Sequence, residues 1–161
     1  MLVMGILNVT PDSFADGGVH FDAGEAITCG IQMAHDGAHI IDVGGESTRP
    51  GAQRISEDEE LNRVLPVISE LIKAGAKVSV DTMRASVAEK SGAHIINDVS
   101  GGKADPQMFA TVAKLGKPYI LMHWRGHSTE MDNKAIYDDV VAEVISELET
   151  QIKLALEAGI K

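Results

Sequence analysis

The chain has 161 residues, of which 44% are hydrophobic and only 4% aromatic, so we expect one ordered domain whose core is filled by aliphatic side chains. Its formal net charge of -10 argues against a nucleic-acid partner and against binding to anionic membrane surfaces. An anionic substrate would therefore need local help from a metal ion, an arginine or backbone amides.

Five short apolar runs follow one another along the chain, and segments with helical spacing separate them. Each run is continuously apolar, which is typical of parallel strands covered on both faces. The clearest helix opens at Ser56 with a capping-box pattern and ends near Gly75, and the last one ends near Gly159. This order predicts successive βαβ units and an α/β fold. The runs are residues 2–8, 39–45, 77–82, 94–99 and 118–123.

The crossover between the third and fourth runs is unusually short. Only residues 83–93 separate Thr82 from His94, whereas a parallel crossover usually needs a dozen residues or more. Either the third helix is short or part of the crossover is missing. The chain also stops at Lys161, directly after a helix, where a barrel would begin its sixth strand. We therefore predict one domain over residues 1–161 that is incomplete at its C-terminus.

Each predicted strand ends on a polar residue, and these are Asn8, Asp42, Asp81, Asn97 and His123. In parallel α/β proteins the C-terminal strand ends face one common crevice or barrel mouth, so these side chains are expected to converge. Asp and Asn are also common at the start of turns. Five strands fit either an open doubly wound sheet or part of an eight-stranded barrel, and the pattern alone does not decide between them. A dinucleotide-binding sheet is disfavoured because no G-x-G-x-x-G follows the first strand.

Two of the strand-to-helix connections are long and rich in glycine, serine and threonine. They read "NVTPDSFADGG" over residues 8–18 and "GGESTRPGA" over residues 44–52. A bare connection in an α/β unit needs only about 2–6 residues, so the excess length indicates loops that contact a ligand. Thr48 and Arg49 in the second loop place a hydroxyl beside a guanidinium, which suits a cluster of anionic oxygens.

These stretches resemble the dihydropteroate synthase family, whose enzymes join a pterin to p-aminobenzoate in folate biosynthesis. The resemblance rests on "MGILNVTPDSFADGG", "IIDVGGESTRPGA", "VSVDTMRASVA" and "GAHIINDVSGG", and it covers essentially the whole chain. "YILMHWRG" supports it and looks like the actinobacterial branch. The resemblance implies a (β/α)8 TIM barrel, of which this chain supplies about the first five βα units. It also implies that the full-length protein is a homodimer and a target of sulfonamides.

The resemblance assigns roles to five residues outside the tip of the first loop. Asn8 matches the family's Mg²⁺-binding asparagine, and Mg²⁺ is the implied cofactor. Asp81 and Asn97 match residues that bind the pterin. Thr48 and Arg49 match residues that border the diphosphate and the aminobenzoate, and Arg49 is expected to stabilise the departing diphosphate.

Asp12 and Phe14 lie on the first loop, which folds over the bound substrates in this family. The resemblance implies that Phe14 walls the aminobenzoate ring and that Asp12 helps to stabilise a developing cation. Asp42 is expected to be structural at the barrel floor, His123 to be a core histidine, and Met122 to be part of the core.

The implied reaction condenses 6-hydroxymethyl-7,8-dihydropterin diphosphate with p-aminobenzoate to give 7,8-dihydropteroate and diphosphate. The family carries further site residues on strands six to eight, and none of those motifs occurs here, so the 161-residue chain alone is expected to be inactive. Two alternatives stay open. One is a pterin-binding barrel of the methyltetrahydrofolate-dependent methyltransferase type, and the other is a non-catalytic pterin-binding fragment.

The expected partners are small-molecule substrates, and the expected location is the cytoplasm. No apolar run approaches the ~20 residues of a membrane span. The first residues lack a basic segment followed by a cleavage site, so no signal peptide is expected. Cys29 is the sole cysteine, which excludes an intrachain disulfide and fits a reducing compartment.

Overall fold

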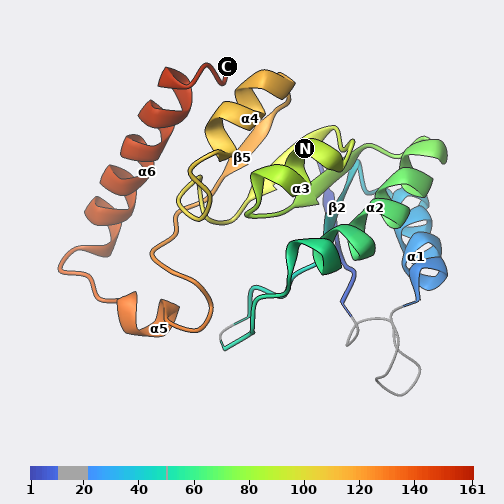
Figure 1. Cartoon of the computed structure of the whole chain (residues 1–161), viewed down its shortest axis with the longest axis horizontal. Helices are drawn as coiled ribbons and strands as arrows, with labels where there is room; N and C mark the ends of the chain where they lie inside the picture. The colour runs from blue at the N-terminus through green and yellow to red at the C-terminus, as the bar shows by residue number, and fades with distance from the viewer. Residues whose placement is uncertain (11–21, 50) are drawn as a thin grey trace.

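The computed structural model describes residues 1–10, 22–49 and 51–161, and it contains a five-stranded parallel sheet with helices between successive strands (Figure 1). In chain order the elements are β1 (Met4–Asn8), α1 (Ala23–His35), β2 (Ile40–Gly44), α2 (Glu57–Lys73), β3 (Val78–Asp81), α3 (Ala85–Lys90), β4 (Ile95–Asp98), α4 (Met108–Leu115), β5 (Tyr119–Leu121), α5 (Met131–Lys134) and α6 (Val140–Glu157).

The strands pair in the order β1-β2-β3-β4-β5, so each strand lies beside the next one in the chain. A doubly wound sheet reverses direction and places its first strand in the interior of the sheet, whereas a β/α barrel adds strands in sequence order. The sheet order therefore decides for the barrel arrangement, which the sequence pattern left open.

Local sequence signals explain where the helices begin and end. The Asp22 side chain accepts hydrogen bonds from the backbone N–H groups of the first turn of α1, and Ser56 caps α2 through Glu59 N at 3.2 Å. The chain then leaves α1, α2 and α3 through Gly37, Gly75 and Gly92, all at positive φ. Glycine adopts this left-handed conformation without steric cost, which explains why a Gly-Ala pair precedes each of β2, β3 and β4.

The third crossover is complete with a helix of only six residues, α3. Of the two explanations for its length, the structure therefore shows the short helix. Val87 and Ala88 of α3 are fully buried, so even this short helix covers part of the sheet.

The hydrophobic core lies between the sheet and helices α1 to α4. Alternate strand residues point into it, as the two-residue period of a strand requires. Leu71 and Ile68 of α2 meet them, and both are fully buried. The strand residues of this core include Leu7, Ile41, Val43, Val78, Val80 and Ile96.

The opposite face of the sheet is the one that a closed barrel would enclose. At its two edges Ile6 and Ile120 are 65% and 38% exposed, so the apolar surface of this face is open.

Figure 1 places α6 at the end of the molecule opposite α1. Within the described ranges, no helix has the length and hydropathy needed to cross a membrane.

Candidate active site

Three of the predicted site residues lie in one row across the C-terminal ends of the strands. Asn8 pairs with Gly44, Gly44 with Asp81, and Asp81 with Asn97. Residues that pair laterally in a parallel sheet project from the same face, which here is the face away from the helices. The predicted convergence of Asn8, Asp81 and Asn97 is therefore confirmed.

Gly44 keeps the centre of this row open. A Cβ atom placed on Gly44 would lie 3.3 Å from Asp81 Oδ2 and 3.8 Å from Asn8 Oδ1. The two side-chain oxygens therefore flank the position where any larger residue would project. The row forms an open floor with oxygen acceptors on both sides of the gap.

Asp42 lies one layer beneath this row, two residues before Gly44 on β2. It is 4% exposed, and its Oδ2 accepts a hydrogen bond of 2.9 Å from Asn97 Nδ2. The expectation that Asp42 belongs to the barrel floor is confirmed. Asp42 Oδ1 is also buried and has no hydrogen-bond partner within the described ranges. Ser79 pairs with Asp42 in the register of β2 and β3, and its buried hydroxyl is the neighbouring donor on that side.

The floor combines several acidic groups in a poorly solvated space. Burial, together with the nearby negative charges of Asp42 and Asp98, raises the pKa of Asp81 to about 7. Burial also raises the pKa of Asp42, against the opposing effect of the neighbouring Ser79 and Asn97 side chains. A planar ligand with several N–H donors would satisfy these carboxyl groups and restore their charged form.

The turn after β4 fixes the position of Asn97 in the floor. Asp98 is fully buried and accepts hydrogen bonds from Ser100 N at 2.8 Å, Gly102 N at 2.9 Å and the hydroxyl of Tyr119 at 2.8 Å. The Tyr119 bond links β4 to β5 at the residue next to Asn97. It therefore holds the edge of the floor to the fifth strand.

Replacing Tyr119 with phenylalanine is expected to lower the free energy of unfolding by about 1–2 kcal/mol, because a buried carboxylate loses a donor. Urea denaturation followed by circular dichroism measures this loss. Tyr137→Phe is the matched control, since it keeps the ring that Arg125 covers at 3.8 Å. Equal stabilities of the two variants would contradict the role given to the Tyr119 hydroxyl.

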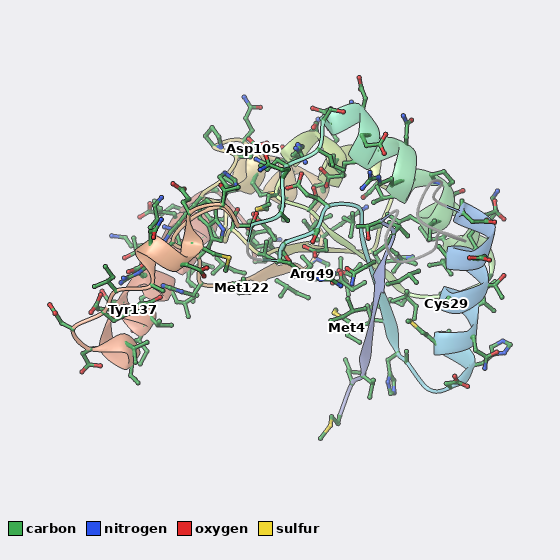
Figure 2. All side chains as sticks on the ribbon, turned by 90° about the horizontal axis from the view of Figure 1, so that it is seen from below. Met4, Cys29, Arg49, Asp105, Met122 and Tyr137 are labelled. Atoms are coloured by element: carbon green, nitrogen blue, oxygen red, sulfur yellow. The ribbon has the colours of Figure 1, made fainter. Side chains whose placement is uncertain are left out.

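The second loop, residues 45–56, reaches across the mouth to the segment after β5. Gly51 N donates to Ser128 O at 2.8 Å, and the Ser128 hydroxyl donates to Ala52 O at 2.8 Å. Thr48 and Arg49 are exposed on this loop. Figure 2 views this end of the molecule and shows Arg49 and Met122 near its middle, with Cys29 and Tyr137 toward opposite sides.

A cavity of about 190 Å³ lies between the second loop and the segment after β5. Its walls are mainly apolar, with the hydroxyls of Ser47 and Thr48 on the loop side. A small flat ligand fits such a space, with polar groups available at one edge. Met83, Val99, Met122 and Trp124 supply apolar walls.

Two sequence-based assignments on the β5 side are wrong. Met122 was expected in the core, but it is 47% exposed and lines the cavity. His123, expected either to converge with the other strand ends or to be a core histidine, does neither: it is only partly buried, and its Nε2 lies 3.1 Å from Glu147 Oε2 on α6. Ile120 pairs with Asn97 and therefore lies on the floor side of β5. Side chains alternate along a strand, so Met122 lies on the floor side as well and His123 lies on the other side. Counting by two from Ile120 would have identified Met122 as a residue of the site.

The remaining predicted site residues cannot be placed, and the metal prediction stays open. Asp12 and Phe14 lie outside the described residues. Within residues 1–10, 22–49 and 51–161, no group of three or more His, Cys, Asp or Glu side chains could hold a metal ion. Asn8 is exposed and offers one amide oxygen, which fits a Mg²⁺ ion bound mostly through water and substrate phosphates.

The strand order, the polar floor and the two long loops define an α/β-barrel protein whose ligand site lies at the C-terminal ends of its strands. Residues 4–161 match the family described as "Pterin binding enzyme", and the chain belongs to this family. The expected resemblance is thereby confirmed.

Individual relatives agree with the family assignment. The chain is 51% identical to dihydropteroate synthase of Mycobacterium leprae over 98% of its own length and 57% of that protein. It is 50% identical to dihydropteroate synthase of Bacillus subtilis over 99% of its length and 55% of that protein. The chain thus spans little more than half the length of these relatives.

Solved structures of dihydropteroate synthase also match the chain over nearly its whole length. Dihydropteroate synthase of Xanthomonas albilineans with 4-aminobenzoic acid superposes with a TM-score of 0.88 at 44% identity, over 99% of this chain and 57% of that one. The same enzyme in complex with 7,8-dihydropteroate gives a TM-score of 0.84 at 40% identity, over 99% of this chain and 56% of that one.

Proposed function

We propose that the complete natural polypeptide carrying this sequence is a dihydropteroate synthase. It condenses 6-hydroxymethyl-7,8-dihydropterin diphosphate with p-aminobenzoate to give 7,8-dihydropteroate and diphosphate. The observation that carries the proposal is the row of Asn8, Asp81 and Asn97 above the buried Asp42 carboxyl group. The proposal draws further support from relatives that bear this name and from related structures that bind 4-aminobenzoic acid and 7,8-dihydropteroate.

The floor is proposed to bind the pterin ring. A pterin edge presents N–H donors beside ring nitrogens, and the carboxylate of Asp81 accepts from such donors. Asn97 donates its amide N–H to Asp42, so its carbonyl oxygen remains free to accept from the ligand. Binding would hold Asp81 in its ionised form by replacing the lost solvation with hydrogen bonds.

The two long loops are proposed to bind the diphosphate and the aminobenzoate. Arg49 and Thr48 approach the diphosphate from the second loop, and Asn8 would hold a Mg²⁺ ion at the same end of the sheet. The ion would neutralise charge on the leaving group. Phe14 and Asp12 of the first loop are proposed to wall the aminobenzoate and to stabilise a developing cation.

The proposed chemistry is electrostatic and positional. The C–O bond to the diphosphate breaks while the dihydropterin delocalises positive charge; the neutral arylamine then attacks the exocyclic carbon, and the resulting ammonium nitrogen releases its proton to solvent. The site needs no strong general base because the arylamine is already a neutral nucleophile at pH 7. Cationic groups near Arg49 lower the barrier by stabilising the departing diphosphate.

The activity is proposed for the complete polypeptide. Strands six to eight are proposed to supply the further anion and pterin contacts, and the 161-residue chain alone is predicted to be inactive. Sulfonamide binding at the aminobenzoate position belongs to the same proposal. The homodimer and the cytoplasmic location stay predictions.

Release of diphosphate tests the proposed function directly. The complete natural polypeptide is incubated with Mg²⁺ and the pterin diphosphate, with and without p-aminobenzoate. Release of diphosphate that requires both substrates is the expected result. Turnover with a methyl-folate donor instead would favour the methyltransferase alternative, and pterin binding without any turnover would favour a non-catalytic pterin-binding protein.

Replacing Asn8 with alanine is expected to weaken Mg²⁺-dependent binding of diphosphate by about tenfold, because one ligand of the ion is lost. A tenfold change in affinity corresponds to ~1.4 kcal/mol of binding free energy. Isothermal titration with sodium diphosphate, with and without Mg²⁺, measures the change. Asn62→Ala, on the exposed surface of α2, is the control and should behave like the wild type. If the Asn8→Ala variant binds diphosphate with unchanged affinity, the proposed role of Asn8 in holding Mg²⁺ is wrong.

A further inference from the structure

We infer that Arg84 is a positioning residue that closes the base of the second loop and thereby holds Thr48 and Arg49 over the floor. The inference rests on the proposed function, because it assigns the loop to the diphosphate. Arg84 itself is not proposed to touch a substrate. It acts through a group of side chains that we call the Arg84 cluster, formed by Arg84, Glu46, Glu60 and Thr82.

The guanidinium of Arg84 joins three separate parts of the chain. Its Nη1 donates to Glu46 Oε2 at 2.9 Å and also to Glu60 Oε2 on α2. Its Nη2 donates to the backbone carbonyl of Ile55. Glu46 is near the beginning of the second loop and Ile55 near its end, so one side chain connects both ends of the loop.

Glu46 strengthens this closure from the loop's own side. Its Oε1 accepts from Arg54 Nε at 3.0 Å, and its Oε2 accepts from Ile55 N at 3.2 Å. The base of the loop is therefore a ring of hydrogen bonds, while Thr48 and Arg49 at the tip remain exposed. A loop closed at its base in this way loses less conformational freedom when its tip binds a ligand.

The same cluster is tied to the floor through Thr82. Thr82 directly follows Asp81, the last residue of β3, and its hydroxyl donates to Glu60 Oε1 at 2.5 Å. The same hydroxyl accepts from Arg84 N at 3.1 Å. The position of the loop base is therefore set relative to Asp81, which fixes how far the tip lies from the floor.

Both carboxylates of the cluster are buried. Glu60 is 1% exposed and Glu46 8%, so water has little access to replace Arg84 as their partner. Gly45 adds to the fit, because a Cβ atom there would lie 2.8 Å from Val64 Cγ1 of α2. A planar guanidinium can bridge two carboxylates and a carbonyl at once, whereas an ammonium group acts as a point charge. Arg84→Lys therefore keeps the charge but breaks the bridge.

The test separates positioning from general stability. In the complete natural polypeptide, Arg84→Lys is titrated calorimetrically with sodium diphosphate in the presence of Mg²⁺, and separately with 6-hydroxymethylpterin. We expect diphosphate affinity to fall at least tenfold while pterin affinity stays within twofold of wild type. Lys90→Gln is the control. It removes the exposed ion pair between Lys90, the last residue of α3, and Glu57 of α2, and it should change neither affinity.

A combined variant shows whether Arg84 acts through the loop. In a Thr48→Ala/Arg49→Ala background, Arg84→Lys is expected to change diphosphate affinity less than twofold, because both groups that it positions are already gone. Additive losses would mean that Arg84 acts by another route and would overturn the inference. Equal losses of diphosphate and pterin affinity in the single variant would reduce Arg84 to a purely structural role.

Two further outcomes keep this inference distinct from the proposed function. A wild-type protein that binds no diphosphate would overturn the proposed function, and the inference with it. A wild-type protein that binds diphosphate normally, with Arg84→Lys unchanged, would overturn the inference alone. If Arg84→Lys does not fold, Glu46→Gln serves in its place, because it removes the charge of one of the two carboxylates that Arg84 contacts. Glu46→Gln is expected to lose diphosphate affinity and to keep pterin affinity. Unchanged diphosphate affinity in Glu46→Gln would likewise overturn the inference.

Discussion

Replacing Asp81 with asparagine is expected to make the protein more stable at pH 8. The folded-state pKa of Asp81 is raised from 3.8 to about 7, so the folded protein holds a proton that the unfolded chain releases. Stability therefore falls as the pH rises from about 4 to about 7, and this loss persists above pH 7. Asparagine removes the cost, which we place at about 4 kcal/mol at pH 8 and below about 1 kcal/mol at pH 4.

The same substitution is expected to lower pterin affinity by at least about 100-fold, because the charged acceptor of the floor is lost and an amide donor takes its place. Calorimetric titration with 6-hydroxymethylpterin measures the affinity, and urea denaturation at pH 4 and pH 8 measures the stability. Asp58→Asn on the exposed start of α2 is the control for both. A variant that binds pterin normally would reduce Asp81 to a turn residue.

Replacing Arg84 with methionine is expected to cost about 3–5 kcal/mol of stability, since two buried carboxylates lose their shared cation. Glu60 is the more sensitive of the two, because burial already raises its pKa and Arg84 opposes that shift. Without Arg84 the pKa of Glu60 rises further. The variant should therefore recover part of the loss as the pH falls and Glu60 takes up a proton.

Urea denaturation at pH 5 and pH 7.5 measures this effect. Lys114→Met is the control: its 2.8 Å ion pair with Glu89 joins two exposed side chains, and its loss is expected to leave the stability nearly unchanged. A loss in Arg84→Met as small as in the control, or one that does not change with pH, would contradict the account of the Arg84 cluster.

Much of the local structure could be predicted because its causes are local. Apolar runs predicted the strands, and caps such as Ser56 predicted where helices begin. The glycines that end the helices adopt positive φ, which is again a local requirement. The choice between an open sheet and a barrel could not be predicted in the same way. It depends on which strand lies beside which, and hydrogen bonds between distant strands leave no mark on the local pattern.

The site was predictable where strand ends carry polar residues. Asn8, Asp81 and Asn97 follow that rule and lie in one row. His123 broke the rule because β5 ends at Leu121, which turns residue 123 toward α6. The Arg84 cluster was not predicted at all, since charged residues far apart in the chain give no periodic signal of their pairing.

A crystal structure of the complete natural polypeptide with 6-hydroxymethyl-7,8-dihydropterin diphosphate and Mg²⁺ tests the central claim most directly. We predict that the pterin edge lies within hydrogen-bonding distance of Asp81 and Asn97, with the diphosphate beneath Arg49 and the metal on Asn8. A ligand bound at the opposite end of the strands, or one that leaves Asp81 and Asn97 untouched, would contradict it.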